Sequence, residues 1–361
     1  MKDIKAIAFY LPQFHPVEDN NKWWGNGFTE WTNVGKAKKY FKTHYQPRIP
    51  KDLGYYDLRV AETRKAQAEM AKEHGIDAFC YWHYWFGNGK RLLERPLHEV
   101  VAINEPDFPF CLGWANESWK GFAHGLKNRN TLIEQLYPGK EDIVNHFYTM
   151  LDTFKDKRYL RIEEKLVFLI YKPLADCSIK DFIRMWRALA KENDLNDFYF
   201  IGHINNLDQS YDEVLNLGFD AVNTVRIVDF MKNDNLLSRV ANKFIKRMLR
   251  RPNYFTYSKA SKYFYNNTID NLENVIPSLI TGWDHTPRSG KEGLVLTNYT
   301  PKSFKEHIEY VFENVSKKEN KLIFVKSWNE WAEGNYLEPD LKFGRQFLEI
   351  FKDVKIKYLN R

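Results

Sequence analysis

Short apolar segments recur along the chain, and stretches with helical periodicity separate them. Each segment carries a nearly continuous apolar run, which is typical of a parallel strand covered on both faces. Eight segments fit this description: 5–11, 76–84, 108–115, 165–171, 198–204, 219–225, 275–281 and 321–327. Helical patterns occur at 59–74, 91–104, 140–155, 178–193, 208–217, 235–249, 302–318 and 343–356.

This alternation constrains the fold strongly. Parallel strands need crossover connections, and eight strand-then-helix units close into a (β/α)8 barrel. A chain of 361 residues suits one such barrel with elaborated loops after its strands. No linker or low-complexity tract divides the chain. We therefore predict an α/β fold in which residues 1–361 form a single TIM barrel domain.

The composition narrows the function classes. Aromatic residues make up 16% of the chain, with 11 Trp and 21 Tyr, which is high for a soluble enzyme. The net charge of +7 is moderate, and the sequence carries neither an RNA-binding motif nor a Gly-rich phosphate loop. Nucleic acid is therefore not an expected partner, and the aromatic excess needs a use beyond core packing.

The cysteines and the N-terminal residues indicate the cellular compartment of the protein. Cys80, Cys111 and Cys177 are odd in number and widely spaced, without a zinc-binding pattern, so we expect reduced thiols in the core. Residues 1–10 have the pattern of a strand and not of a signal peptide, and no apolar run approaches the length of a membrane span. These features predict a cytoplasmic protein.

The tryptophans gather where a barrel enzyme has its active site. In this fold the site lies in the loops at the C-terminal ends of the strands. Ten of the eleven Trp close or follow a predicted strand, and only Trp186 falls on a predicted helix. The ten are Trp23, Trp24, Trp31, Trp82, Trp85, Trp114, Trp119, Trp283, Trp328 and Trp331. The pattern favours a carbohydrate cleft, and a protein or peptide groove is the alternative.

The segment 327–334 (SWNEWAEG) places two carboxylates between two indoles at the end of the last strand. A continuing strand would turn Glu330 and Glu333 to opposite faces, whereas a helical turn beginning at Asn329 or Glu330 would make them neighbours. Paired carboxylates beside aromatic faces are the groups that glycosidic bond chemistry requires. The alternative is a pair of solvated charges that open a helix.

The same loops carry further polar and aromatic candidates for substrate binding. These are His15, Trp24, Glu30, Trp31, His83, Trp85, Trp114, Asn116, Glu117, Trp283, Asp284, Arg288, Asn329 and Trp331. Each has a structural alternative, such as a hydrogen-bonded core histidine at His15 or His83 and a turn residue at Asp284.

Residues 238–264 are the main source of positive charge. Their aliphatic residues are compatible with a basic amphipathic surface that rests on an anionic membrane or a lipid-linked substrate. The alternative is a solvated helix followed by a loop.

Seven motifs together resemble the WbsX-type polysaccharide-biosynthesis family, which is related to glycoside hydrolase family 99. They are YLPQFHP (10–16), NKWWGNGFTEWTNV (21–34), LGYYDLR (53–59), HGIDAFCYWHYWF (74–86), PFCLGWANESW (109–119), GWDHTPR (282–288) and SWNEWAEGNYLEPD (327–340). Family 99 consists of (β/α)8 endo-acting α-mannosidases that retain anomeric configuration. The resemblance implies that Glu330 is the base that assists the sugar 2-hydroxyl and that Glu333 is the general acid and then base.

Two functions follow as hypotheses. The first is a retaining glycoside hydrolase or transglycosidase that acts on a free or lipid-linked polysaccharide or oligosaccharide and requires no cofactor or metal. The second is a sugar-nucleotide glycosyltransferase for O-antigen or capsule, which the family's usual label suggests. The chain shows no nucleotide fingerprint and no Asp-x-Asp metal site, so the chemistry favours the first.

Overall fold

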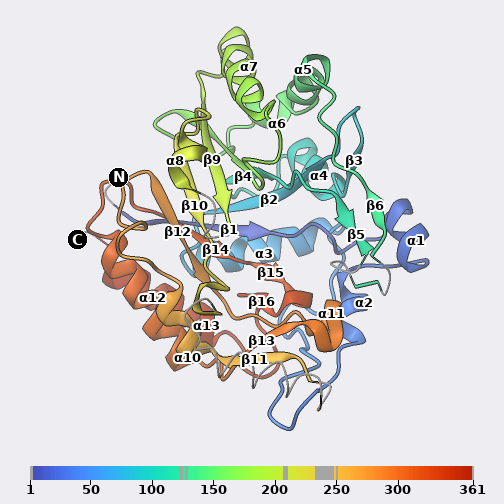
Figure 1. The fold of residues 1–361 in the computed structure, drawn as a ribbon, viewed down its shortest axis with the longest axis vertical. Helices are drawn as coiled ribbons and strands as arrows, with labels where there is room; N and C mark the ends of the chain where they lie inside the picture. The colour runs from blue at the N-terminus through green and yellow to red at the C-terminus, as the bar shows by residue number, and fades with distance from the viewer. Residues whose placement is uncertain are drawn as a thin grey trace.

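The computed structural model describes residues 3–121, 125–126, 129–205, 210–231, 248 and 251–359. Eight parallel strands form a closed barrel at the centre of the molecule (Figure 1). They are β1 (Lys5–Tyr10), β2 (Ala78–Trp85), β4 (Phe110–Trp114), β8 (Lys165–Ile170), β9 (Phe198–Ile204), β10 (Ala221–Thr224), β12 (Val275–Ile280) and β14 (Leu322–Lys326). All eight predicted strands are confirmed, and so is the barrel.

The barrel closes through β1, which pairs with β14 on one side and with β2 on the other. The register aligns Ile7 with Phe324 across the first pair and Phe9 with Cys80 across the second. The order around the barrel is β1, β14, β12, β10, β9, β8, β4 and β2. Because the sheet closes on itself, none of these strands is left as an edge.

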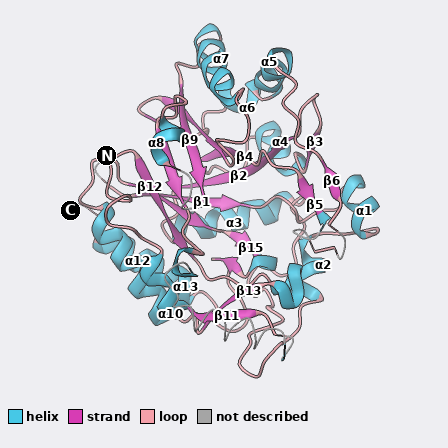
Figure 2. Ribbon diagram, viewed as in Figure 1, coloured by secondary structure: helices cyan, strands magenta, loops and turns pink. Residues whose placement is uncertain are grey.

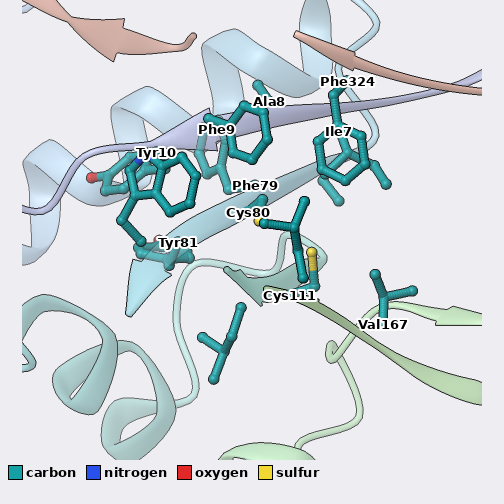
Figure 3. Packing of buried hydrophobic residues seen from close by; sticks show 14 of the residues in the cluster. Ile7, Ala8, Phe9, Tyr10, Phe79, Cys80, Tyr81, Cys111, Val167 and Phe324 are labelled. Carbon is teal, nitrogen blue, oxygen red and sulfur yellow. The ribbon is translucent and has the colours of Figure 1, made fainter. Parts of the chain in front are cut away.

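Aromatic and smaller apolar side chains pack closely around β1 and β2 in the core (Figure 3). The ring of Phe9 lies 4.7 Å from Trp82 and 4.9 Å from Phe324, stacked in both cases. Cys80 and Cys111 lie buried on adjacent strands, as predicted. The prediction of a core thiol was wrong for Cys177, which is exposed because it lies in the polar turn between β8 and the next helix.

Helices surround the strands (Figure 2). The main ones are α3 (Ala61–Glu73), α4 (Arg95–Ile103), α5 (Lys140–Thr149), α6 (Leu151–Lys155), α7 (Ile179–Glu192), α8 (Tyr211–Leu215), α12 (Pro301–Val315) and α13 (Gln346–Lys357). Neighbouring helices such as α12 and α13 pack side by side (Figure 1). On α7 the residues Phe182, Trp186 and Leu189 are buried, the spacing of a single helix face.

The helix predictions differ from the structure in three places. The segment 91–104 begins with β3 (Arg91–Leu92), which pairs with the end of β2, so the helix starts only at Arg95. The segment 140–155 forms two helices, with a break at Met150. The predicted helix 235–249 lies almost entirely outside the described residues.

The connection from β1 to α3 contains two short helices, α1 (Glu18–Trp24) and α2 (Glu30–Gly35). A capping box formed by Thr29 and Thr32 starts α2. The expectation that only Trp186 falls on a helix was therefore wrong, because Trp23, Trp24 and Trp31 also lie on helices. Short loop helices escape periodicity analysis because they complete only one or two turns.

The loops of the barrel contain shorter elements. They are β5 (Trp119–Lys120), β6 (Thr131–Ile133), β7 (Arg161–Ile162), β11 (Asn253–Thr256), β13 (Leu294–Thr297), β15 (Asn329–Glu330), β16 (Asn335–Tyr336), α10 (Tyr257–Ala260) and α11 (Thr286–Ser289), with 3-10 turns η2 (Asp229–Met231), η3 (Ser261–Tyr263), η4 (Gly290–Glu292) and η5 (Trp331–Glu333). None of the helices formed by the described residues is long and apolar enough to cross a membrane.

Close packing of β9 against α8 provides a test of the fold. A Cβ atom on Gly202 would lie 2.3 Å from Cγ1 of Val214, which is fully buried. We expect Gly202→Ala to lower the free energy of unfolding by about 1–3 kcal/mol because the core must shift to admit the methyl group. Urea unfolding followed by Trp fluorescence measures the change. Gly35→Ala is the control, since no atom lies within 4 Å of its added Cβ; equal losses in both variants would contradict the packing argument.

Candidate active site

The two candidate catalytic glutamates lie in the turn that follows β14. Glu330 ends β15, which pairs with β16, and the 3-10 turn η5 carries the chain from Trp331 to Glu333. Residues three apart eclipse one another in a 3-10 turn, so the two carboxylates come to the same side. Gly334 closes the turn with a positive φ of 59°, and a Cβ there would lie 2.7 Å from Cβ of Asp284. Of the two conformations considered from the sequence, the structure has a turn, but the turn begins at Trp331 and not at Asn329 or Glu330, because these two residues form β15.

Arg288 joins three carboxylates from different parts of the chain. Its Nε donates to Glu30 Oε1 at 2.8 Å, and its two terminal nitrogens donate to Glu333 Oε1 at 2.5 Å and to Glu330 Oε1 at 3.3 Å. Glu30 lies on α2 in the first loop, Arg288 lies on α11 after β12, and the other two follow β14. The guanidinium of Arg288 therefore links three loops to one another through hydrogen bonds.

This cluster carries more negative than positive charge. Lys326 adds a second cation, with Nζ 3.5 Å from Glu330 Oε2, so among the described residues two cations contact three carboxylates. Burial and the two neighbouring glutamates raise the pKa of Glu30 above its ordinary value, against the pull of Arg288. The same three carboxylates outweigh the effect of burial on Arg288 and raise its pKa. With all five groups ionised, the cluster would carry one uncompensated negative charge. One bound proton would neutralise this charge, which is costly to bury.

His285 does not supply a further positive charge at neutral pH. Burial, assisted by Arg288, lowers its pKa to about 4. Its Nε2 lies 3.6 Å from Glu333 Oε1, and its Nδ1 lies 2.5 Å from the hydroxyl of Ser289. The neutral ring therefore borders Glu333 without pairing with it ionically.

Glu330 and Glu333 line a cavity of about 280 Å³ at the C-terminal ends of the strands. We call this cavity the glutamate pocket. The volume is near the lower end of the range for ligand sites. Of the predicted residues it is lined by Glu117, Trp283, Arg288, Glu330 and Glu333; the other lining residues are Leu11, Gln13, Trp82, Tyr84, Ala115, Trp119, Tyr171, His203, Asn205, Val225, Ile227, Val228 and Lys326. Most of these residues lie at or just after the end of a strand. The alternation of side chains between the two faces of a strand could have shown which of them point into the barrel.

His203 is a pocket residue that the sequence did not single out. Its Nδ1 lies 2.7 Å from Oδ1 of Asn223. The amide nitrogen of Asn223 donates to the carbonyl of Ile276 and to the hydroxyl of Ser278, so Oδ1 is the acceptor and Nδ1 carries the proton. Burial lowers the pKa of His203 to about 3. Nε2 is thus left as an acceptor, suited to a hydroxyl donor.

Three predicted residues lie behind the pocket and hold its loops. Both amide atoms of Asn329 bond to the backbone of Leu11. Asp284 accepts from His44 Nε2 at 2.7 Å and from Thr286 at the start of α11, and its backbone N–H donates to the carbonyl of Glu333 at 2.6 Å. Burial acts to raise the pKa of Asp284, but the bond from His44 and the nearby Arg48 hold it below its ordinary value.

Trp331, the third of these residues, is anchored by Glu338. The indole nitrogen of Trp331 donates to Glu338 Oε2 at 2.6 Å. The same carboxylate accepts from the hydroxyl of Tyr56 at 2.8 Å and from Nε2 of Gln67 at 2.6 Å. Burial raises the pKa of Glu338 to about 7, although the donated bonds act in the opposite direction. This network fixes the turn that spaces Glu330 and Glu333.

Other predicted residues are not brought to the pocket. His83 lies buried with Nε2 2.8 Å from that of His146, and burial lowers its pKa to about 3. Trp85 stacks on His146 at 4.4 Å, and the indole of Trp114 donates to the carbonyl of Trp85. These three side chains extend the barrel core outward between β2, β4 and α5.

The remaining candidates support the loops. His15 is buried, with Nδ1 3.1 Å from the carbonyl of Pro12. Asn116 bonds through both amide atoms to the backbone of Lys172. Trp24 stacks on Phe28 at 4.6 Å, and Trp31 packs against Trp331 at 5.5 Å.

The family model described as "Glycosyltransferase WbsX" matches residues 6–351 of this chain. The chain belongs to the WbsX family. The resemblance found in the sequence motifs is thereby confirmed, and the barrel built above is the fold of a WbsX protein.

The curated relatives of this chain are longer proteins. Two WxcX proteins from strains of Xanthomonas campestris pv. campestris, themselves uncharacterized, are 31% and 30% identical to it over 357 residues. The matched region is 96% of this chain and 49% of each relative. The chain thus spans about half the length of the curated relatives it matches.

Solved structures share the fold. A glycoside hydrolase-like protein matches with a TM-score of 0.63 at 16% identity, over 98% of this chain and 94% of that one. The GH99 endo-alpha-mannosidase from Bacteroides thetaiotaomicron matches with a TM-score of 0.57 at 14% identity, over 99% and 98%. The WbsX family therefore shares the barrel architecture of these carbohydrate-active enzymes.

The buried carboxyl of Glu338 predicts a specific pH dependence of stability. Its pKa in the folded protein, about 7, exceeds the 4.5 of an unperturbed carboxyl, so between these values the folded state binds the proton more tightly than the unfolded chain. Stability should therefore fall as pH rises through this window, by up to about 3 kcal/mol. Glu338→Gln, which cannot ionise, should lack this part of the fall. Urea unfolding at several pH values between about 4.5 and 8 measures it.

The exposed carboxyl of Glu349 provides the matched control. Glu349→Gln should leave the pH dependence of the wild-type chain unchanged. A difference between Glu338→Gln and the wild type that stays constant with pH would show that Glu338 is not protonated in this window.

Proposed function

We propose that the chain cleaves or transfers glycosyl units of a polysaccharide or oligosaccharide by a retaining glycoside hydrolase-type mechanism. The observation that carries the proposal is the position of Glu330 and Glu333. Both carboxylates line one pocket, and both bond to the same guanidinium of Arg288. Retaining and inverting glycosidases alike require two carboxylates at the scissile bond.

The surroundings of the two glutamates support different roles. Glu330 is buried and contacts two cations, Arg288 and Lys326. Glu333 is the more exposed of the two and borders the neutral ring of His285, where a leaving oxygen can reach it. Glu330 as the base that assists the 2-hydroxyl, and Glu333 as the acid and then base, agree with these surroundings.

The walls of the glutamate pocket suit a sugar ring. Aromatic side chains line it from several strands, namely Trp82, Tyr84, Trp119, Tyr171 and Trp283. Aromatic faces pack against the apolar faces of pyranose rings, and polar groups such as Gln13 and His203 offer hydrogen bonds to hydroxyls. The same walls would suit a glycan in hydrolysis or in transfer.

A sugar-nucleotide glycosyltransferase for O-antigen or capsule is the second candidate function. The description of the matched family favours it. A nucleotide donor would have to be bound within the loops of the barrel. The lipid-linked substrate, cytoplasmic location and membrane contact through 238–264 remain predictions, and most of 238–250 lies outside the described residues.

The decisive prediction concerns the glutamates and the donor. Incubation of the purified chain with a panel of α-linked glycans should yield products without any nucleotide sugar, with anomeric configuration retained. Glu330→Gln and Glu333→Gln should each lower the rate at least about 100-fold, because each removes a proton-transfer group. Anomeric proton NMR follows both the rate and the configuration.

Glu349→Gln, an exposed carboxylate on α13, is the control and should keep the wild-type rate. Turnover that requires a nucleotide sugar would overturn the hydrolase-type proposal in favour of the transferase. Wild-type rates in both glutamate variants would remove the paired-carboxylate mechanism.

A further inference from the structure

One wall of the glutamate pocket is aliphatic. Val225, Ile227 and Val228, which follow β10, all line the cavity. Val225 and Ile227 are buried, whereas 42% of Val228 is exposed. The other described strand ends around the cavity contribute an aromatic, charged or amide side chain. The β10 segment therefore differs from the rest of the site in offering only hydrocarbon.

The polar residue within this segment turns away from the pocket. Arg226 lies between Val225 and Ile227, and its Nε donates to Asp270 at 2.8 Å. Its terminal nitrogens donate to Asp270 at 3.0 Å and to Asp229 at 3.2 Å. The guanidinium is buried in these contacts and does not line the cavity. It therefore has no role in binding a substituent at the aliphatic wall.

The backbone and packing of the segment hold the wall in place. The N–H of Val225 donates to the carbonyl of Ile204 on β9. Val225 and Ile227 belong to a hydrophobic cluster with Phe230 and Leu296, and Trp283 packs against this cluster. Moving Val225 or Ile227 would break this cluster, so these two residues form a fixed apolar surface beside the more exposed Val228.

The order of the strands places this wall within the site. β10 lies between β12, whose loop carries Trp283 and Arg288, and β9, which carries His203. The glutamates follow β14, on the other side of β12. Glu330, Glu333 and the aliphatic wall line the same cavity of about 280 Å³, so a sugar bound at the glutamates can also contact this wall.

We propose that the sugar bound in the glutamate pocket carries a methyl group that packs against Val225, Ile227 and Val228. The methyl of a 6-deoxyhexose has this chemistry, and such a sugar keeps the 2-hydroxyl that Glu330 is proposed to assist. A hydroxymethyl group in the same position would lose its bonds to water and gain no partner from this wall. The inference rests on the proposed function, because it names the substrate class of the same pocket.

Matched pairs of monosaccharides test the inference. Mannose and galactose, each in the D and L form, are compared with their 6-deoxy counterparts, and D-glucose and D-galactose with their 2-acetamido counterparts. Saturation-transfer NMR and competition titration measure the affinity ratio within each pair. In at least one 6-deoxy pair the methyl-bearing sugar should bind about tenfold more tightly, with strong saturation of its methyl protons. A preference confined to the acetamido pairs, whose methyl group replaces the 2-hydroxyl, would overturn the assignment to a 6-deoxyhexose.

Val228→Thr keeps the shape of the side chain and adds a hydroxyl to the wall. It should lower the favourable affinity ratio at least about threefold. Val60→Thr, at an exposed position outside the pocket, makes the same chemical change and should leave the ratio unaltered. An unchanged ratio in Val228→Thr would overturn the assignment of the methyl group to this wall.

Failure of the inference is distinguishable from failure of the proposed function. If glycans without methyl substituents are turned over in a Glu333-dependent manner and the hydroxymethyl sugars bind as tightly in every pair, the inference is wrong and the proposed function stands. If no saccharide binds and no glycan is turned over, the proposed function is wrong and the inference falls with it.

Discussion

Closure of the barrel through β1 is the constraint on which the rest of the structure depends. By pairing with both β14 and β2, β1 joins the first and last strands of the chain. The loop after β1 thereby comes to lie beside the loop after β14. The N–H of Trp328 donates to the carbonyl of Phe9, and Asn329 clamps the backbone of Leu11. Glu30 meets Glu330 and Glu333 only because these two loops are adjacent.

The charge cluster at this junction serves both architecture and chemistry. Arg288 satisfies three carboxylates, which ties three loops together, yet one guanidinium and Lys326 leave a negative charge in excess. Burial and the two neighbouring glutamates raise the pKa of Glu30 in this setting. The residues that link the three loops are thus the same ones for which acid and base roles are proposed.

Sequence reasoning succeeded where the signal was local. Continuous apolar runs identified all eight strands, because strands covered on both faces have no polar alternation to obscure them. The spacing of Glu330 and Glu333 gave a turn as one of two conformations, and its starting residue came only from the structure. The interpretation of the tryptophans was less complete: their gathering at strand ends did not separate Trp283, which lines the pocket, from Trp85 and Trp114, which are buried. An indole at a strand end points inward or outward according to alternation and strand tilt, which composition does not reveal.

What the sequence determined by itself is the architecture and the family motifs, and it singled out Glu330 and Glu333 as candidates, because these depend on periodicity and short spacing. Only the tertiary structure decided that Arg288 bridges both glutamates to Glu30, that His203 presents an acceptor to the pocket, and that the β10 segment forms an aliphatic wall. Each of these facts joins residues far apart in the chain. Their physical cause is the order of strands around a closed barrel, which places loops side by side whatever their separation in sequence.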